Sequence, residues 1–171
     1  MEQKSLISLL VKNEKGILAK ISELISDAGI NIEKLVASSV DTNNKISKLI
    51  FYLTGERGKV NEFFEKNIKT LDGVLNINNF IANNEFVENE LLMVKILQNN
   101  VNFSEINNII SSNNGKIIYI NGTIVIYQII SDSDNVDDVI RKIYFLTKDI
   151  EISRTGIVAM DFSNDLKSTN Y

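Results

Sequence analysis

A strand, a polar loop and the start of a helix follow one another in Ile7-Ser8-Leu9-Leu10-Val11-Lys12-Asn13-Glu14-Lys15-Gly16-Ile17-Leu18. The apolar run Leu6–Val11 is typical of a short buried strand, and Lys12–Gly16 of a connecting loop. Apolar residues then recur at helical spacing, which predicts one apolar helix face: Ile17, Leu18, Ile21, Leu24, Ile25 and Ala28. Gly29 stands where a glycine commonly ends a helix.

The pattern that follows completes a β-α-β-β-α-β unit. Two extended runs, Ile32–Val40 and Ile46–Thr54, are joined by the polar turn Asp41–Lys45. A second amphipathic helix is marked by Val60, Phe63, Phe64 and Ile68, and Val74–Phe80 alternates as a closing strand. This order of elements is that of the ferredoxin-like fold.

The second half repeats the same order. The expected strands are Leu91–Leu97, Lys116–Ile120, Thr123–Ile130 and Glu151–Met160, and the expected helices are marked by Phe103, Ile106, Ile109, Ile110, Val136, Val139, Ile140, Ile143 and Tyr144. Asn121-Gly122 between apolar runs predicts a hairpin turn, because both residues tolerate positive φ.

The repeated order predicts an α+β protein of two tandem ferredoxin-like βαββαβ domains, residues 1–82 and 83–171, the second with a flexible tail from Asp161. Helices would cover one face of each sheet, so the apolar residues on the other face or an edge predict contacts with a partner.

Composition excludes several classes of protein. Lys and Arg total 18 against 22 Asp and Glu, with no basic segment, so we expect no nucleic-acid partner. No apolar run reaches the roughly 20 residues that cross a bilayer, and the polar Met1–Ser5 does not resemble a signal peptide. We therefore expect a cytoplasmic protein that makes no membrane contact.

The chain contains no Cys and no His. Thiolate nucleophiles, Ser–His–Asp triads and His- or Cys-ligated metals are therefore impossible within it. Carboxylate or lysine chemistry stays open, but no constellation for it stands out. We accordingly predict a chain without catalytic residues, metal site or cofactor of its own.

The loop Asn13-Glu14-Lys15-Gly16 is the first candidate ligand site. A helix N-terminus presents unpaired N–H groups that can hold a carboxylate, Gly16 lets a ligand approach the backbone, and Asn13 offers a donor and an acceptor. The simpler interpretation is an N-cap at Asn13 and a turn-closing glycine.

Asn31 is the second candidate, because it opens the second strand and is expected at the same end of the sheet as that loop. Its simpler interpretation is a helix-to-strand turn residue.

Acidic residues gather in two other places. Asp132, Asp134, Asp137 and Asp138 could suggest a cation site, but the EF-hand spacing is missing and the dipole of the following helix explains acidic residues there. Glu85, Glu88 and Glu90 are interpreted as a solvated approach to a strand rather than an acid/base pair.

Four segments resemble one family. Ile7–Leu18 and Gly29-Ile30-Asn31-Ile32-Glu33-Lys34-Leu35 look like an ACT domain, particularly that of acetohydroxyacid synthase (acetolactate synthase) small subunits. Glu90-Leu91-Leu92-Met93-Val94-Lys95 resembles the start of that family's second domain, and Arg154-Thr155-Gly156-Ile157-Val158-Ala159 its ending. The resemblance therefore spans the chain from Leu6 to about Met160.

The resemblance implies a non-catalytic regulatory subunit that binds the catalytic large subunit, activates it and confers feedback inhibition by valine or a related amino acid. Thiamine diphosphate, magnesium and FAD would belong to the catalytic partner. The effector would bind between two ACT domains of a homodimer. The positions that match the family's effector motif are Asn13, Glu14, Gly16, Ile17, Leu18, Asn31 and Ile32.

Some positions depart from the family pattern. Phe86 and Asn89 stand where the family often has His and Arg, and Lys48 replaces a family Arg. Two alternatives stay open. A stand-alone amino-acid-sensing ACT regulator of another pathway would not need the Arg154-Thr155-Gly156 ending, and a self-contained enzyme would show turnover on its own.

Overall fold

The computed structural model describes residues 2–56, 58–83, 86–97 and 102–162. The chain divides into two compact units, each described here by itself. Unit 1 comprises Met1–Val87 and the segment that begins at Val158, and unit 2 comprises Glu88–Ile157. The α+β fold, with a ferredoxin-like order of elements in each unit, agrees with the sequence prediction.

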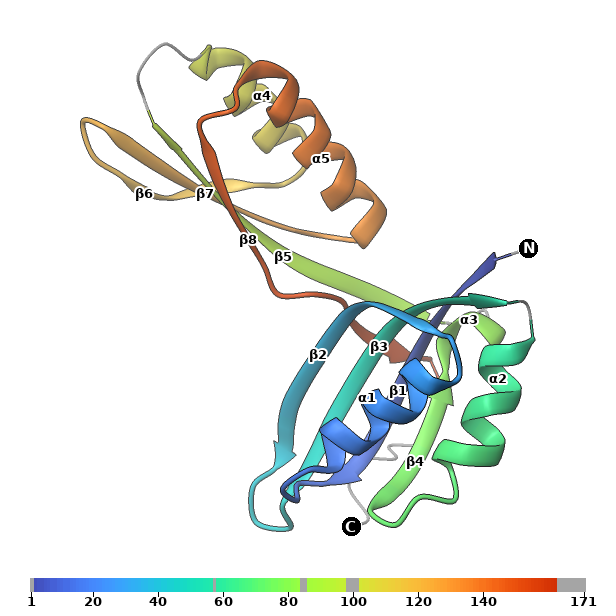
Figure 1. Ribbon diagram of the computed structural model, residues 1–171. Helices are drawn as coiled ribbons and strands as arrows, with labels where there is room; N and C mark the ends of the chain where they lie inside the picture. Colours follow the sequence, from blue (N-terminus) through green and yellow to red (C-terminus); the bar gives the residue numbers. More distant parts are fainter. Residues whose placement is uncertain (1, 57, 84–85, 98–101, 163–171) are drawn as a thin grey trace. The chain divides into compact units, whose positions relative to one another are not determined.

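Unit 1 is built on an antiparallel sheet in the order β2-β3-β1-β4 (Figure 1). Its strands are β1 (Glu2–Lys12), β2 (Asn31–Asp41), β3 (Ile46–Glu56) and β4 (Val74–Asn79). β2 and β4 are therefore the edge strands, and β3 and β1 are the two central strands. Because β1 and β2 both pair antiparallel with β3, they run in the same direction.

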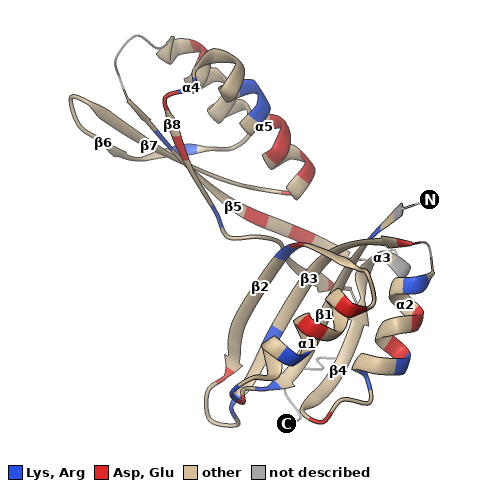
Figure 2. Ribbon diagram, viewed as in Figure 1, with Lys and Arg blue, Asp and Glu red and all other residues tan. Residues whose placement is uncertain are grey.

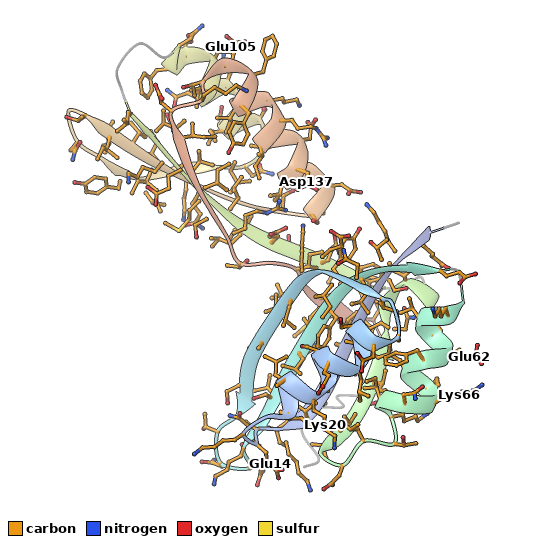
Figure 3. The ribbon with its side chains drawn as sticks, in the orientation of Figure 1. Glu14, Lys20, Glu62, Lys66, Glu105 and Asp137 are labelled. Carbon is orange, nitrogen blue, oxygen red and sulfur yellow. The ribbon has the colours of Figure 1, made fainter. Side chains whose placement is uncertain are left out.

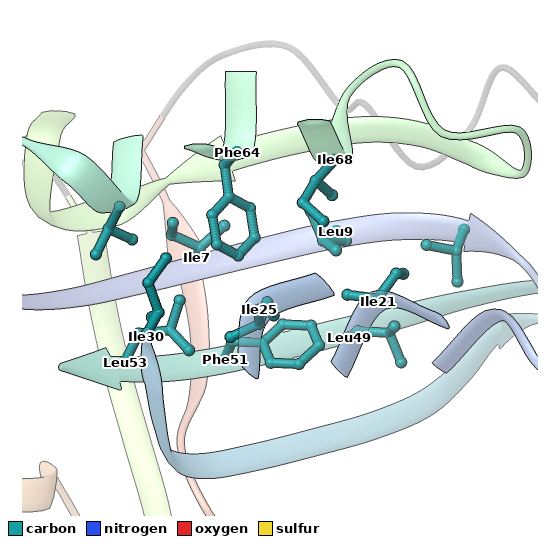
Figure 4. Close-up of a cluster of buried hydrophobic side chains, with 12 residues drawn as sticks. Ile7, Leu9, Ile21, Ile25, Ile30, Leu49, Phe51, Leu53, Phe64 and Ile68 are labelled. Carbon is teal, nitrogen blue, oxygen red and sulfur yellow. The ribbon is translucent and has the colours of Figure 1, made fainter. Parts of the chain in front are cut away.

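The helices α1 (Ile17–Asp27) and α2 (Lys59–Phe63), the latter continued by the π-helical η1 (Phe64–Ile68), cover one face of this sheet (Figure 1). The apolar helix positions meet alternate residues of β1 and β3 in one core (Figure 4). The single second helix of the sequence prediction changes its winding at Phe64, whose carbonyl accepts from the N–H of Lys69. Phe64 and Ile68 both remain buried.

The opposite face of the unit 1 sheet is also buried in part. Leu6, Ser8 and Ile50, which point away from α1 and α2, are each at most 6% exposed. Two short elements lie against this face: α3 (Phe80–Asn83), and β9 (Val158–Asp161), which pairs with β5. The sequence pattern predicted neither α3 nor a second role for the last strand.

Unit 2 has an antiparallel sheet in the order β6-β7-β5-β8. Its elements are β5 (Phe86–Leu97, which starts in unit 1), α4 (Phe103–Ser112), β6 (Lys116–Ile120), β7 (Ile124–Ser131), α5 (Ser133–Leu146) and β8 (Ile150–Arg154). Apolar residues of α4 and α5 pack with alternate residues of β5 and β7, with Tyr127 the largest side chain in this core. Tyr127 Oη donates to Asn107 at 2.7 Å.

The prediction of a single last strand over Glu151–Met160 is wrong. It is divided into β8 and β9, which belong to different units. Gly156 between them has φ +79°, a conformation that interrupts an extended chain and favours glycine. Where the sequence analysis divides the domains after residue 82, the structure keeps residues 83–87 with unit 1 and returns the chain to it at Val158.

The Asn121-Gly122 hairpin joins β6 to β7 as expected. Positive φ is found at neither residue. Instead, the Asn121 side-chain oxygen accepts from the backbone N–H groups of Thr123 and Ile124, at 2.9 and 2.8 Å. The asparagine thus closes the turn with its side chain, so the backbone needs no left-handed residue.

Two of the motif segments named above lie side by side in unit 2. Glu90 accepts two hydrogen bonds from Arg154, and Leu91 exchanges bonds with Thr155 through its N–H and carbonyl. The prediction of a solvated Glu90 is wrong, because its side chain is 1% exposed. Glu88 is half-buried and accepts from the N–H of Ser133, and Glu85 lies outside the described residues.

Candidate functional site

Three connections meet where β1 ends. The N–H of Lys12 donates to the carbonyl of Gly73, which precedes β4, at 2.8 Å, and the N–H of Asn13 donates to the carbonyl of Lys45, which precedes β3, at 2.5 Å. The β1–α1 loop is thereby fixed between the two neighbouring turns. A loop held at its first two residues presents its remaining groups in a defined geometry, as a ligand site requires.

Gly16 is the N-cap of α1 and has φ +89°. No side chain caps the helix, so the N-cap interpretation of Asn13 is wrong. The first turn of α1 also contains no acidic residue. Among the residues described, the N–H groups of Leu18 and Ala19 have no acceptor, as expected for the first turn of a helix. The positive end of the α1 dipole is therefore open to an anion.

The side chains around this helix end divide into polar and apolar groups. Asn13 and Glu14 are exposed, and Figure 3 shows Glu14 and Lys20 at the end of unit 1 where β1 passes into α1. Ile17 and Leu18 are half-buried and pack against the unit 1 core. The tip of Ile17 lies over Gly73, where an added Cβ would come within 3.3 Å of it.

The neighbouring β2–β3 turn is ordered by Asp41. Its Oδ1 accepts from the N–H groups of Asn43 and Asn44 at 2.9 and 3.0 Å, and its Oδ2 accepts from the Asn44 amide at 2.9 Å. These bonds, those from Asn44 above all, lower the pKa of Asp41. Lys45 then takes φ +51° and offers its carbonyl to Asn13. The polar composition of Asp41–Lys45 predicts a turn, but it does not reveal this support for the loop.

Asn31 does not lie at this end of the sheet. It is level with Thr54 of β3 and therefore with Lys4 of β1, whereas the candidate loop follows Lys12. The eight residues from Lys4 to Lys12 span about 27 Å at about 3.4 Å per residue. The expectation that Asn31 and the Asn13–Gly16 loop share one end of the sheet is therefore wrong for a single chain.

The Asn31 side chain is exposed and donates to Glu33 at 2.7 Å. The next residue, Ile32, is half-buried and packs against the unit 1 core. The structure thus brings together Asn13, Glu14, Gly16, Ile17 and Leu18, and it separates them from Asn31 and Ile32.

β2 is an edge strand of 11 residues. Residues 35–40 of this strand carry no charge (Figure 2), and Leu35 and Val40 are exposed. Charged residues and prolines commonly protect edge strands against pairing with another chain. Residues 35–40 include neither, so this part of the β2 edge is suited to accept a further strand.

Over the part that the structure describes, no group of three or more Asp and Glu side chains could hold a metal ion. Asp132 instead caps α5 by accepting from the N–H of Asn135, while Asp137 and Asp138 pair with basic side chains. In the same residues, no helix is long and apolar enough to span a bilayer.

Comparison with known proteins covers both units. Residues 7–76 match the family model described as the AHAS small subunit-like ACT domain, and residues 89–162 match that of the small subunit of acetolactate synthase. These two matches correspond to the two repeats of the sequence pattern.

Individual relatives agree over nearly the whole chain. The acetolactate synthase small subunit of Buchnera aphidicola (subsp. Baizongia pistaciae) is 30% identical over 91% of this chain and 96% of its own. The isozyme 3 small subunit of Salmonella typhimurium is 28% identical over 91% and 93%. The crystal structure of the Thermotoga maritima small subunit superposes with a TM-score of 0.80 at 28% identity, over 95% of this chain and 99% of that one. This chain therefore belongs to the family of acetolactate synthase small subunits, with an ACT domain at its N-terminus.

Proposed function

We propose that this protein is the regulatory subunit of a cytoplasmic acetolactate synthase, and that it activates the catalytic large subunit and confers feedback inhibition by valine or a related branched-chain amino acid. The chain itself is non-catalytic. Family membership supports this role, as does the lack of the His and Cys side chains on which most hydrolytic and metal chemistry depends. The catalytic subunit would hold the thiamine diphosphate, magnesium and FAD.

The proposed effector site begins at the N-terminus of α1. The free N–H groups of Leu18 and Ala19 would receive the carboxylate of the amino acid beside Gly16. The exposed Glu14 and Asn13 would accept from its ammonium group, and the half-buried Ile17 and Leu18 would supply an apolar surface for a branched tail. The uncapped helix end without acidic residues is the observation that carries this proposal.

Asn31 and Ile32 join the site only in a homodimer. If the β2 strands of two copies pair antiparallel about Val36, the strand midpoint, Asn31 of one copy lies opposite Asp41 of the other. Asp41 is level with Ile46, which is level with Lys12 directly before the effector loop. In this register Glu33 faces Ser39, and no like charges are opposed. The separation seen in one chain is then the reason why two copies are needed.

A thermal-shift series with valine tests the effector site. A ligand that binds only the folded state stabilises it by about 2.7 kcal/mol at 100 times its Kd, so valine should raise the Tm of the full chain. Gly16→Asp and Gly16→Ala form a matched pair, because both side chains suffer the same positive φ and a Cβ meets no atom within 4 Å. Aspartate should abolish the shift and alanine should largely keep it. Equal responses in the two variants would remove the α1 N-terminus from the site.

Reconstitution with the cognate catalytic large subunit tests the regulatory role. The expected result is higher acetolactate synthase activity that valine reduces. If valine raises the Tm of the chain but the chain neither binds nor activates the large subunit, it would be a stand-alone ACT regulator of another pathway. Turnover by the purified chain would instead indicate an enzyme.

A further inference from the structure

β9 (Val158–Asp161) packs against the face of the unit 1 sheet that lies opposite α1 and α2. Lys48, on β3, donates from Nζ to the carbonyl of Ala159 at 3.2 Å, and its Nζ lies 5.8 Å from the centre of the Phe80 ring. Asn78, on β4, donates its amide to the carboxylate of Asp161. Ala159 is buried between these two contacts. β9 is thus fixed at two points to two strands of the ACT sheet.

The two strands that β9 contacts, β3 and β4, both pair with β1, which leads to the proposed effector loop. Lys48 is paired with Leu10 of β1 on one side and with Ser38 of β2 on the other. Asn78 is paired with Ser8 of β1. β1 enters the Asn13–Gly16 loop only a few residues later, and β2 is the proposed dimer edge. A change in strand position at either place would therefore reach the residues that hold β9.

β9 is also tied to the chain that forms unit 2. It pairs with β5, which continues into that unit, and Thr155, just before β9, is hydrogen-bonded to Leu91 of β5. The chain therefore passes between the units twice, through segments that pair with one another. Coupling between distant sites is carried by contiguous hydrogen-bonded elements, and the paired β9 and β5 segments form one such element.

β9 is buried on one face only. Its alternate residues Val158 and Met160 are 50% and 69% exposed, so only one face of this four-residue strand is buried. Burial lowers the pKa of Lys48 and Asp161 opposes this effect, so the ammonium group is half-desolvated and depends on its partners. A four-residue strand with one exposed face belongs to the part of a structure that opens at low cost.

We propose that β9 is a latch, and that its attachment through Lys48 and Asn78 couples effector binding in unit 1 to unit 2. The coupling of effector binding to unit 2 rests on the proposed function, whereas the attachment of β9 through Lys48 and Asn78 does not. When the latch is closed, the ACT sheet and the paired β5 and β9 segments move together. When it is open, unit 2 no longer responds to the effector.

A carboxylate–amide exchange on the full chain tests the latch. Asn78→Asp sets two carboxylates against each other, and Asp161→Asn in the same chain restores an amide–carboxylate pair with the roles reversed. Hydrogen exchange without any effector should speed up at least tenfold for the amides of Val158–Asp161 in the single variant and return close to the original rate in the double variant. Unchanged exchange in the single variant would overturn the latch.

The same variants with valine test the coupling. In the original chain and in the double variant, valine should slow exchange in both unit 1 and β5–β8 of unit 2, whereas with Asn78→Asp only unit 1 should respond. Equal protection of unit 2 in all three proteins would overturn the coupling. If valine protects nothing in the original chain, the proposed effector fails, while the effector-free comparison still decides the latch.

Discussion

Arg154 and Glu90 form a bidentate ion pair between β8 and β5, with Nε donating to Oε1 at 2.8 Å and Nη2 to Oε2 at 2.6 Å. Nη1 also donates to Asp137 of α5 at 2.6 Å. The bonds to Glu90 are the main reason why the pKa of Arg154 is raised, and burial opposes them. One guanidinium thus joins two strands and a helix of unit 2, which gives the arginine of the Arg154-Thr155-Gly156 ending a structural role.

Replacing this arginine should be costly. Arg154→Met removes the cation from a carboxylate that is 1% exposed, and we expect a loss of about 3 kcal/mol in the free energy of unfolding, the lower end for breaking a buried pair. The double variant Arg154→Met with Glu90→Met should recover much of this, because no buried charge remains. Urea unfolding followed by circular dichroism measures all three proteins.

Arg141→Met is the matched control. Arg141 is largely exposed and only 3.5 Å from Asp138, so the same substitution there should change the free energy of unfolding by no more than about 0.5 kcal/mol. Equal losses at positions 141 and 154 would show that the buried pair contributes nothing specific.

A second pair of variants tests the packing of unit 2 around Gly115. A Cβ at Gly115 would lie 2.6 Å from Ile110 Cγ2, 2.7 Å from Ile129 Cγ1 and 2.8 Å from the Ile110 carbonyl oxygen. Because a backbone atom cannot rotate away, Gly115→Ala should cost about 1–3 kcal/mol. At Gly122 a Cβ meets no atom within 4 Å, so Gly122→Ala should stay within about 0.5 kcal/mol in the same denaturation experiment.

The sequence predicted the elements of both units because their apolar residues follow helix and strand periods closely. It missed α3 and the separate β9, since four-residue elements are too short to show a period. It also placed Asn31 wrongly. In a β-α-β unit with parallel strands, the helix returns the chain to the end where β1 starts, so the residue that opens β2 lies far from the β1–α1 loop.

The sequence predicted the candidate loop better than the residues that hold it in place. Gly16 and the start of α1 follow from local sequence, and the structure places them as expected. The prediction of a solvated Glu90 was wrong because the local sequence does not show that an arginine 64 residues later pairs with this glutamate. Lys45 and Gly73 hold the loop through backbone carbonyls, which no side-chain pattern reveals.

The hydrogen bonds that order the β2–β3 turn should depend on pH. Because the amides of Asn43 and Asn44 stabilise the ionised form, the pKa of Asp41 is lowered in the folded protein. The stabilisation is present above the ordinary aspartate pKa of about 3.9 and is lost as pH falls through the lower folded value. NMR titration of the Asn43 and Asn44 amide shifts should show a midpoint below about 3.9, and Asp41→Ala should abolish that transition. A midpoint at or above the ordinary value would contradict the turn geometry.

The proposed pairing of two β2 strands predicts opposite effects for two substitutions at one exposed position. In an antiparallel pair about Val36, Ser39 faces Glu33 of the other copy, and each such contact occurs twice by symmetry. Ser39→Glu opposes like charges and Ser39→Lys opposite ones, at about 0.2–1 kcal/mol per contact. Over two contacts, glutamate should therefore weaken dimerisation by about two- to thirtyfold relative to the original chain, and lysine should maintain or tighten it. Analytical ultracentrifugation measures both, and high salt should reduce the difference because the charges are exposed. Equal dimerisation of the two variants at low salt would exclude this register, and a monomeric original chain would exclude the dimer that brings Asn31 to the effector.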